Sequence, residues 1–213
     1  TGATTIDNAV TLPSASTIST TANATLSGAL SGANPLTKNG ASTLTLAGSS
    51  SSHFGAVNVT AGGLTLSGGA ALGNTSAVTM SASTTLIVSS NETIGSLAGA
   101  GSVVLNAALT AGGDNTSTSY SGVISGSFGL TKAGSGTLTL SNSNTYTGAT
   151  NVSAGGLTLS GASGTLDDNT AVTVASGATL TLSANDVISL LSGAGTVALG
   201  ANELVVGVSG GSS

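Results

Sequence analysis

The side chains that could do chemistry are few: the 213 residues include two lysines, seven acids, one histidine and no arginine or cysteine. His53 is the single histidine, and as a catalytic base it would need an orienting acid and a nucleophile nearby. Its counterpart in a second copy of the same motif is Tyr146. A position that accepts either ring is typical of an exposed turn tip, and we expect that structural role.

The two lysines, Lys38 and Lys132, occupy equivalent positions in two similar stretches. A pectin-cleaving enzyme built on a β-helix would concentrate basic and acidic groups in one groove. Two repeated lysines instead predict solvated surface charges, or charges that protect strand edges against pairing with other chains.

The acids also favour structural roles. Glu92 and Asp186 are equivalent positions, while Asp167 and Asp168 are adjacent in a predicted turn that could converge on Ca²⁺. The Gly-Gly-x-Gly-x-Asp calcium repeat is missing, so solvated turn acids are favoured and calcium binding stays open. Glycoside cleavage needs two carboxylates at a defined separation, which no spacing here indicates. We therefore predict no catalytic, cofactor-binding or metal site among Asp7, Glu92, Asp114, Asp167, Asp168, Asp186 and Glu203.

Net charge and hydropathy exclude several classes of binding partner. A net charge of −5 with two lysines excludes a phosphate-tracking surface, so we expect no nucleic acid partner and no attraction to anionic lipids. No apolar run approaches the roughly 20 residues of a membrane helix, so direct membrane insertion is not expected. The chain begins "TGATTIDNAV", without Met, basic residues or an apolar signal core, and we expect an internal segment of a longer protein.

The elements that carry these residues repeat. "LTKNGASTLTLAG" from Leu36 returns as "LTKAGSGTLTLSN" from Leu130, and "NETIGSLAGAGSVVL" from Asn91 returns as "NDVISLLSGAGTVAL" from Asn185, both after 94 positions. We predict a single β-solenoid over residues 1–213. It comprises the end of a partial repeat (1–34), a first copy (35–128) and an incomplete second copy (129–213).

Within each copy, runs of four to six residues alternate apolar and polar side chains between Gly, Asn and Ser clusters. In "GTLTLSN" from Gly136, strand geometry places Leu138 and Leu140 on one side and Thr137 and Thr139 on the other. One such strand cannot bury its leucines, whereas a chain coiled so that each turn stacks on the last can. The pattern predicts an all-β solenoid with no helices of note and about ten rungs, hence about 50 Å long.

Glycines mark the predicted turns. "AGGLTLSG" occurs at Ala61 and Ala154, where paired glycines suit a positive φ or a close backbone approach. Pro35 aligns with Gly129, and proline fixes φ near −65°, so this turn should not need a positive φ. We expect Gly129 to fill a tight space instead.

Two surface motifs have functional alternatives. The Thr-x-Thr pairs beginning at Thr43, Thr137 and Thr179 could bind ice if they covered nearly every rung of one face, but other strands interrupt them. Sequons at Asn58, Asn91 and Asn151 are most simply turn asparagines.

The stretch "LTKAGSGTLTLSNSNTYTGATNVSAGGLTLSG" from Leu130, and its partner from Leu36, resemble the autotransporter-associated β-strand repeat of Gram-negative passenger regions. The first copy departs from it where His53 and Phe54 replace Tyr146 and Thr147. The resemblance implies a right-handed parallel β-helix on the outer cell surface or secreted, acting as a stalk or aiding secretion. It carries over no catalytic residue.

The first functional hypothesis is therefore a non-catalytic stalk. The alternatives are an adhesin or a filament-forming module, with an ice-binding protein or a polysaccharide-cleaving β-helix less favoured. Partners would be other copies of the chain, through end-to-end or lateral association, or a ligand on a host or cell surface. Aromatic platforms for a glycan are restricted to Phe54, Tyr120, Phe128 and Tyr146.

Overall fold

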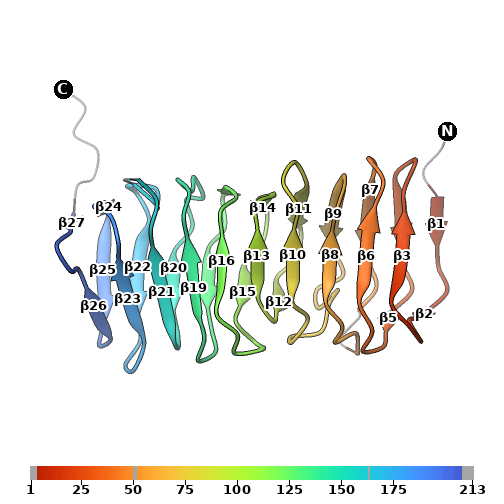
Figure 1. Cartoon of the computed structure of the whole chain (residues 1–213), viewed down its shortest axis with the longest axis horizontal. Coiled ribbons are helices and arrows are strands. Elements are labelled where there is room, and N and C mark those ends of the chain that lie inside the picture. The colour runs from red at the N-terminus through yellow and green to blue at the C-terminus, as the bar shows by residue number, and fades with distance from the viewer. Residues whose placement is uncertain (1–3, 50–51, 163, 208–213) are drawn as a thin grey trace.

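The protein is a rod of stacked turns (Figure 1). The computed structural model describes residues 4–49, 52–162 and 164–207, and this part of the chain contains 27 strands of two to four residues and no helix. All strand pairs in it are parallel, and the turns follow one another from the N-terminal to the C-terminal end of the rod. It therefore also contains no helix that could span a lipid bilayer.

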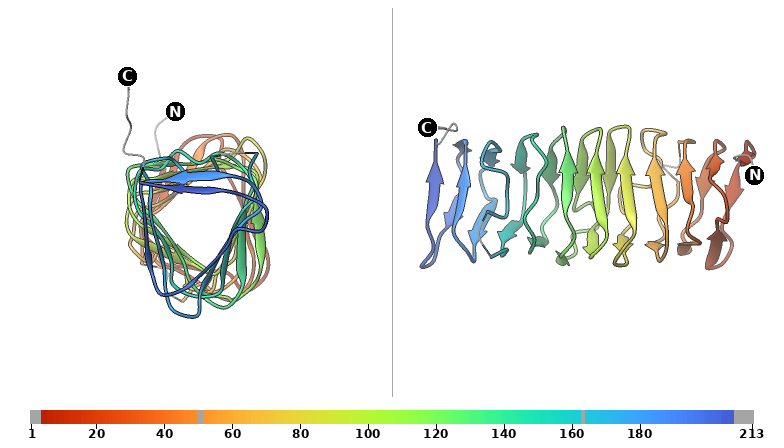
Figure 2. Two further views of the ribbon diagram at one scale, coloured as in Figure 1. Left: turned by 90° about the vertical axis from the view of Figure 1, so that its left-hand side faces the viewer. Right: turned by 90° about the horizontal axis from the view of Figure 1, so that it is seen from above.

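Each turn visits three faces, and the view down the axis shows the turns superimposed in a roughly triangular outline (Figure 2). Face 1 is a seven-stranded sheet. Its strands are β1 (Thr4–Ile6), β4 (Ala24–Leu26), β7 (Thr43–Leu46), β9 (Gly63–Leu66), β11 (Thr85–Val88), β14 (Ser102–Leu105) and β17 (Ile124–Gly126). By chain order, the pair β24 (Asp186–Ile188) and β27 (Leu204–Val206) lies on the same face.

Face 2 is less regular. It begins with the pair β2 (Val10–Thr11) and β5 (Leu30–Ser31), continues through an isolated bridge between Gly32 and His53, and becomes a six-stranded sheet further along the rod. The strands of this sheet are β12 (Glu92–Ile94), β15 (Leu109–Ala111), β18 (Leu130–Lys132), β20 (Thr150–Val152), β22 (Ala171–Val174) and β25 (Leu190–Gly193).

Face 3 is a ten-stranded sheet that runs the whole rod. Its strands are β3 (Ser16–Ser19), β6 (Leu36–Asn39), β8 (Val57–Val59), β10 (Val78–Met80), β13 (Leu97–Gly99), β16 (Thr118–Tyr120), β19 (Thr137–Leu140), β21 (Gly156–Leu159), β23 (Thr179–Leu182) and β26 (Thr196–Ala198). Counted along this face, the solenoid has about ten turns, as the sequence predicts.

Alternation creates the core. On face 1, Leu26 pairs with Leu46, Leu46 with Leu66, and Leu66 with Val88, so one inward position is apolar on successive turns. These side chains are at most 2% exposed. Parallel pairing in register places apolar side chains of successive turns on top of one another. The resulting column is removed from water, which no single strand could achieve for its own side chains.

The glycine predictions are confirmed. Gly62 and Gly155 have φ of +67° and +62°. Gly129 lies outside the positive-φ region, but an added Cβ would lie 2.2 Å from the carbonyl oxygen of Ala149. This residue therefore fills a tight space between turns.

The two repeat copies do not occupy the same faces. "LTK" lies on face 3 as β6 and on face 2 as β18, and "TLTL" lies on face 1 as β7 and on face 3 as β19. Four turns along face 3 lead from β6 to β16, and two further strands, β17 and β18, reach the equivalent position. One repeat thus spans four and two-thirds turns, and the second copy is rotated by a third of a turn.

Candidate functional site: buried charges and outward hydroxyl columns

The charged side chains on strands point inward. Lys38, Glu92, Lys132 and Asp186 are the charged residues of the described strands, and each is at most 3% exposed. The predictions of solvated surface lysines and of solvated turn acids at Glu92 and Asp186 are therefore wrong. Alternation explains the placement, because each lies two residues from an inward Leu or Ile of its own strand.

The Lys38 ammonium is held in a cage of backbone carbonyls. Its Nζ donates to the carbonyl oxygens of Asn39 at 2.9 Å, Gly40 at 2.8 Å and Ala61 at 2.9 Å. Three donors meet three acceptors, so the group is satisfied without a carboxylate. Burial still lowers the pKa of Lys38, because the charged form loses hydration.

Lys132 repeats this cage on another face. Its Nζ donates to the carbonyl oxygens of Ala133 at 2.5 Å, Gly134 at 2.9 Å and Ala154 at 3.3 Å. Burial lowers the pKa of Lys132, and the negative charge of Asp114 offsets part of that shift. Both lysines tie the corner after their own strand to the corner of the next turn, which is a structural function.

The buried carboxylates bind backbone N–H groups where a face lacks a strand. Glu92 accepts from Ala71 N at 2.8 Å and from Leu72 N at 3.2 Å, in the segment between β9 and β10. Burial raises the pKa of Glu92, and these backbone bonds oppose the shift. The side chain thus replaces the main-chain acceptors that a neighbouring strand would supply.

Asp186 repeats the arrangement in the second copy. It accepts from Leu166 N at 3.2 Å and from Val187 N at 2.9 Å. Burial raises the pKa of Asp186, backbone hydrogen bonds oppose the rise, and nearby Asp168 adds to it.

The predicted exposed turn tip at His53 and Tyr146 is also wrong, since both rings are fully buried. The Tyr146 hydroxyl lies 2.6 Å from Thr150 Oγ1, and burial raises its pKa. Neither nitrogen of His53 has a hydrogen-bond partner among the described residues. The rings occupy interior space at equivalent turns, but only the tyrosine is satisfied.

Asn144 is a buried residue that the sequence did not single out. Its Oδ1 accepts from Ile124 N at 2.9 Å, and its Nδ2 donates to Thr165 O at 2.8 Å. It bridges two turns at a point where face 1 has no assigned strand. An asparagine in the middle of a polar turn sequence gave no sign of this role.

The remaining acids lie at the surface or at corners. Asp7, Asp168 and Glu203 are exposed, and Asp114 and Asp167 are half-buried. Asp114 accepts from Ser96 Oγ and from Thr116 N. Burial alone would raise its pKa, but these bonds and one from the Thr116 hydroxyl lower it.

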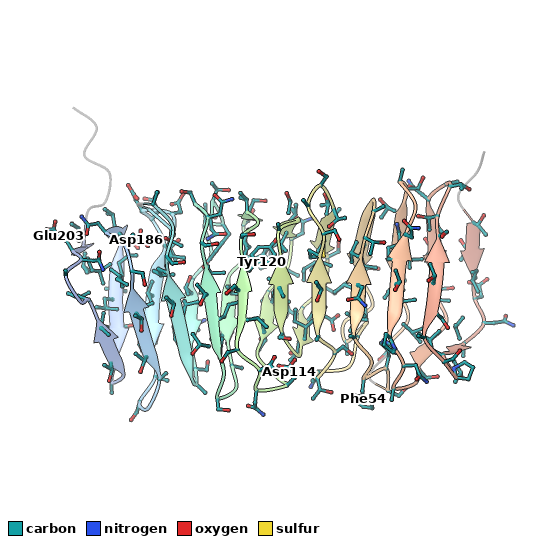
Figure 3. The ribbon with its side chains drawn as sticks, viewed as in Figure 1. Phe54, Asp114, Tyr120, Asp186 and Glu203 are labelled. Atoms are coloured by element: carbon teal, nitrogen blue, oxygen red, sulfur yellow. The ribbon has the colours of Figure 1, made fainter. Side chains whose placement is uncertain are left out.

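One depression gathers acids near the C-terminal end. A space of about 400 Å³ is lined in part by Asp168, Asp186, Glu203, Val187 and Val205, and Figure 3 shows Asp186 and Glu203 towards this end of the rod. In the described part of the chain, no group of three or more His, Cys, Asp or Glu side chains is placed to hold a metal ion. The two oxygens of Asp186 are already bonded to backbone N–H groups.

The outward strand positions form columns of small, mostly hydroxyl side chains without charge. On face 2, Thr93, Thr110, Thr131, Asn151, Thr173 and Ser192 pair in register along six strands. On face 3, the same outward position holds Thr17, Thr37, Asn58, Thr79 and Ala98, followed by Ser119, Thr139, Thr158, Thr181 and Ala198.

The Thr-x-Thr pairs do not share one face. Thr43 and Thr45 lie on face 1, whereas the pairs beginning at Thr137 and Thr179 lie on face 3. Between these two pairs, β21 carries Gly156 at the first position. The described strands therefore lack the uninterrupted array that ice binding would require.

The sequons split between strand and turn. Asn91 lies outside a strand and is exposed, as predicted for a turn asparagine. Asn58 and Asn151 are half-buried strand residues on β8 and β20, which corrects the prediction for both. Their side chains belong to the outward columns.

Exposed aromatic area is small. Tyr120 is buried like Tyr146, whereas Phe54 and Phe128 are 54% and 47% exposed. Phe54 follows the face 2 bridge at His53, whereas Phe128 lies between β17 and β18, so they belong to different corners, several turns apart. In Figure 3, Phe54 and Asp114 lie along the same edge of the rod.

Comparison with known families fits this geometry. Residues 36–70 and 130–159, about a third of the chain, match the model of the passenger-associated-transport-repeat. The chain carries passenger-associated transport repeats. These repeats, carried on a parallel β-solenoid, fit an autotransporter passenger with β-helix repeats, and the resemblance stated from the sequence is confirmed. Comparisons with curated proteins and with solved structures gave no significant match.

Proposed function

We propose that this chain is a non-catalytic spacer within a secreted or surface-displayed passenger of a Gram-negative bacterium. One observation carries the proposal: every charged side chain on the described strands is buried and bonded to backbone groups. The ionisable groups of the described strands are thus used to hold turns together, and the passenger-repeat match supports the location.

The geometry suits a spacer mechanically. Face 3 is hydrogen-bonded from β3 to β26 without interruption. Each turn contacts mainly its neighbours, so stability is close to a sum of turn-to-turn terms, and length can change by whole repeats. The outward columns on faces 2 and 3 are polar and carry no charge, and the length of the rod would hold neighbouring parts of the passenger apart.

The test is a glycan and cell-binding screen with the purified chain, beside small-angle scattering. A spacer gives the scattering of a rod about 50 Å long and no binding above background. Saturable binding that is lost in Phe54→Ser or Phe128→Ser, but kept in the outward control Thr139→Ser, would replace the spacer with the adhesin alternative.

A further inference from the structure

The turn that contains His53 and its counterpart in the second copy bury different rings at the same position. Turn 3 consists of β7, the His53 segment and β8; turn 8 consists of the Tyr146 segment, β20 and β21. Ser76 Oγ donates to His53 O, and Thr170 Oγ1 donates to Tyr146 O. The two ring residues therefore share this bond to their carbonyl oxygen, while the two rings differ in chemistry.

His53 is enclosed on both sides along the axis. Gly32 in the preceding turn forms the isolated bridge with it, and Gly73 in the following turn donates its N–H to His53 O at 2.8 Å. The ring is fully buried between these turns, and among the described residues neither nitrogen has a partner. A neutral imidazole can be buried there at moderate cost, whereas an imidazolium would lose its hydration with the Gly32 backbone as a partial compensation and no carboxylate of the described residues beside it.

The charged neighbours do not compensate for that charge. Residues 24–99, which form turns 2 to 5, contain Lys38 and Glu92 as their charged side chains. The lysine is held by three carbonyls, and the glutamate binds Ala71 and Leu72. Their counterparts Lys132 and Asp186 accompany turn 8, and the turn after it adds Asp167 and Asp168, where the first copy has Gly73 and Asn74.

We propose that turn 3 is an acid-sensitive opening point of the rod, at which protonation of the His53 imidazole disrupts the packing between Gly32 and Gly73. Turn 8 stays closed under the same conditions, because the Tyr146 hydroxyl is bonded to Thr150 and does not gain a proton. The inference does not depend on the spacer function.

The surroundings of His53 determine whether a lower pH stabilises or destabilises the turn. Burial lowers the pKa of His53, and the adjacent Gly32 backbone opposes part of the shift. The open state therefore binds a proton more readily than the closed state, so the closed turn is fully stable above about pH 6.5 and loses stability as the pH falls below it. An unpaired buried histidine changes the opening constant by up to about tenfold between pH 7 and pH 5.5.

Amide hydrogen exchange read by NMR tests this in the intact chain. The reporter is the Phe54 amide, bonded to Gly32 O at 3.0 Å, and its control is the Thr147 amide, bonded to Gly126 O at the same distance. After correction for intrinsic exchange, the Phe54-to-Thr147 ratio of opening constants should rise about tenfold between pH 7 and pH 5.5. A ratio that stays constant overturns the proposal without any variant.

Two variants exchange the rings. His53→Tyr should abolish the pH dependence of the ratio, and Tyr146→His should move it to the Thr147 amide. If the ratio still rises in His53→Tyr, another group causes the opening and the proposal fails. If either variant does not fold, the wild-type ratio decides the question.

Discussion

The two repeat copies place nearly the same sequence on different faces of the rod. Lys38 and Lys132 form the same carbonyl cage, although one lies on face 3 and the other on face 2. Glu92 and Asp186 bind backbone N–H groups in the same way from face 2 and face 1. The comparison teaches that a side chain's environment depends on whether it points into or out of the solenoid and on its distance from a corner.

The copies differ where the sequence differs. The buried ring of His53 has no hydrogen-bond partner in the part of the chain that the structure describes, whereas Tyr146 is bonded to Thr150. The two positions share the hydroxyl that donates to the ring residue's carbonyl, from Ser76 in one copy and from Thr170 in the other. The second copy is thus an internal control for the first.

The largest effect is expected at the glycines that end β13 and β25. An added Cβ at Gly99 or Gly193 would lie 2.0 Å from the carbonyl oxygen of Met80 or Val174, at φ of +101° and +104°. Gly99→Ala and Gly193→Ala should each lower the free energy of unfolding by about 4 kcal/mol, combining backbone strain and overlap. Urea denaturation measures this.

The matched control is Gly177→Ala. Its φ is +80°, but no atom lies within 4 Å of an added Cβ, so the cost should be about 1 kcal/mol. Equal costs at Gly99 and Gly177 would show that close approach between turns contributes nothing.

The next effect concerns the lysine cages. Lys38→Met and Lys132→Met keep a long apolar stem but leave three carbonyls without a donor, which should cost about 3 kcal/mol in each copy. Thr37→Ala, the outward neighbour of Lys38, should stay within about 0.5 kcal/mol. Urea denaturation of all three variants is the measurement. A cost confined to one copy would contradict the conclusion that the face is irrelevant.

The smallest effect is the pH dependence from the buried carboxylates. Because burial raises the pKa of Glu92 and Asp186, their stabilising contribution is complete below the unfolded value and is lost as the pH rises through the folded value. Stability from these groups therefore falls from pH 4 to pH 7. Glu92→Gln and Asp186→Asn should each reduce that fall by about 1 kcal/mol, measured by urea denaturation at both pH values.

Much of the fold was predictable from the sequence because short local patterns of residues determine it. Alternation in stretches such as "TLTL" predicts strands, the 94-residue offset predicts stacked copies, and the Pro35–Gly129 alignment correctly predicts a tight turn without positive φ. Each of these depends on a few neighbouring residues, which is why a single sequence suffices.

The buried charges were missed although the same alternation carried the information. In "LTK", an inward Leu36 places Lys38 inward two residues later, and Ile94 does the same for Glu92. Charged side chains are usually expected in solvent, which argues against the inward positions that alternation gives them. Here, however, each corner of the solenoid offers main-chain groups that satisfy a buried ammonium or carboxylate. Asn144 and the rotation of the second copy could not be predicted, since both depend on how many residues each turn takes.

Turn length in fact varies from 17 residues between Thr85 and Ser102 to 23 between Thr158 and Thr181. Because one repeat takes four and two-thirds turns, a longer array of such copies would point any given surface residue in three directions in succession, and the fourth copy would restore the orientation of the first. A surface residue present once in each repeat would then be displayed on all three faces of the rod.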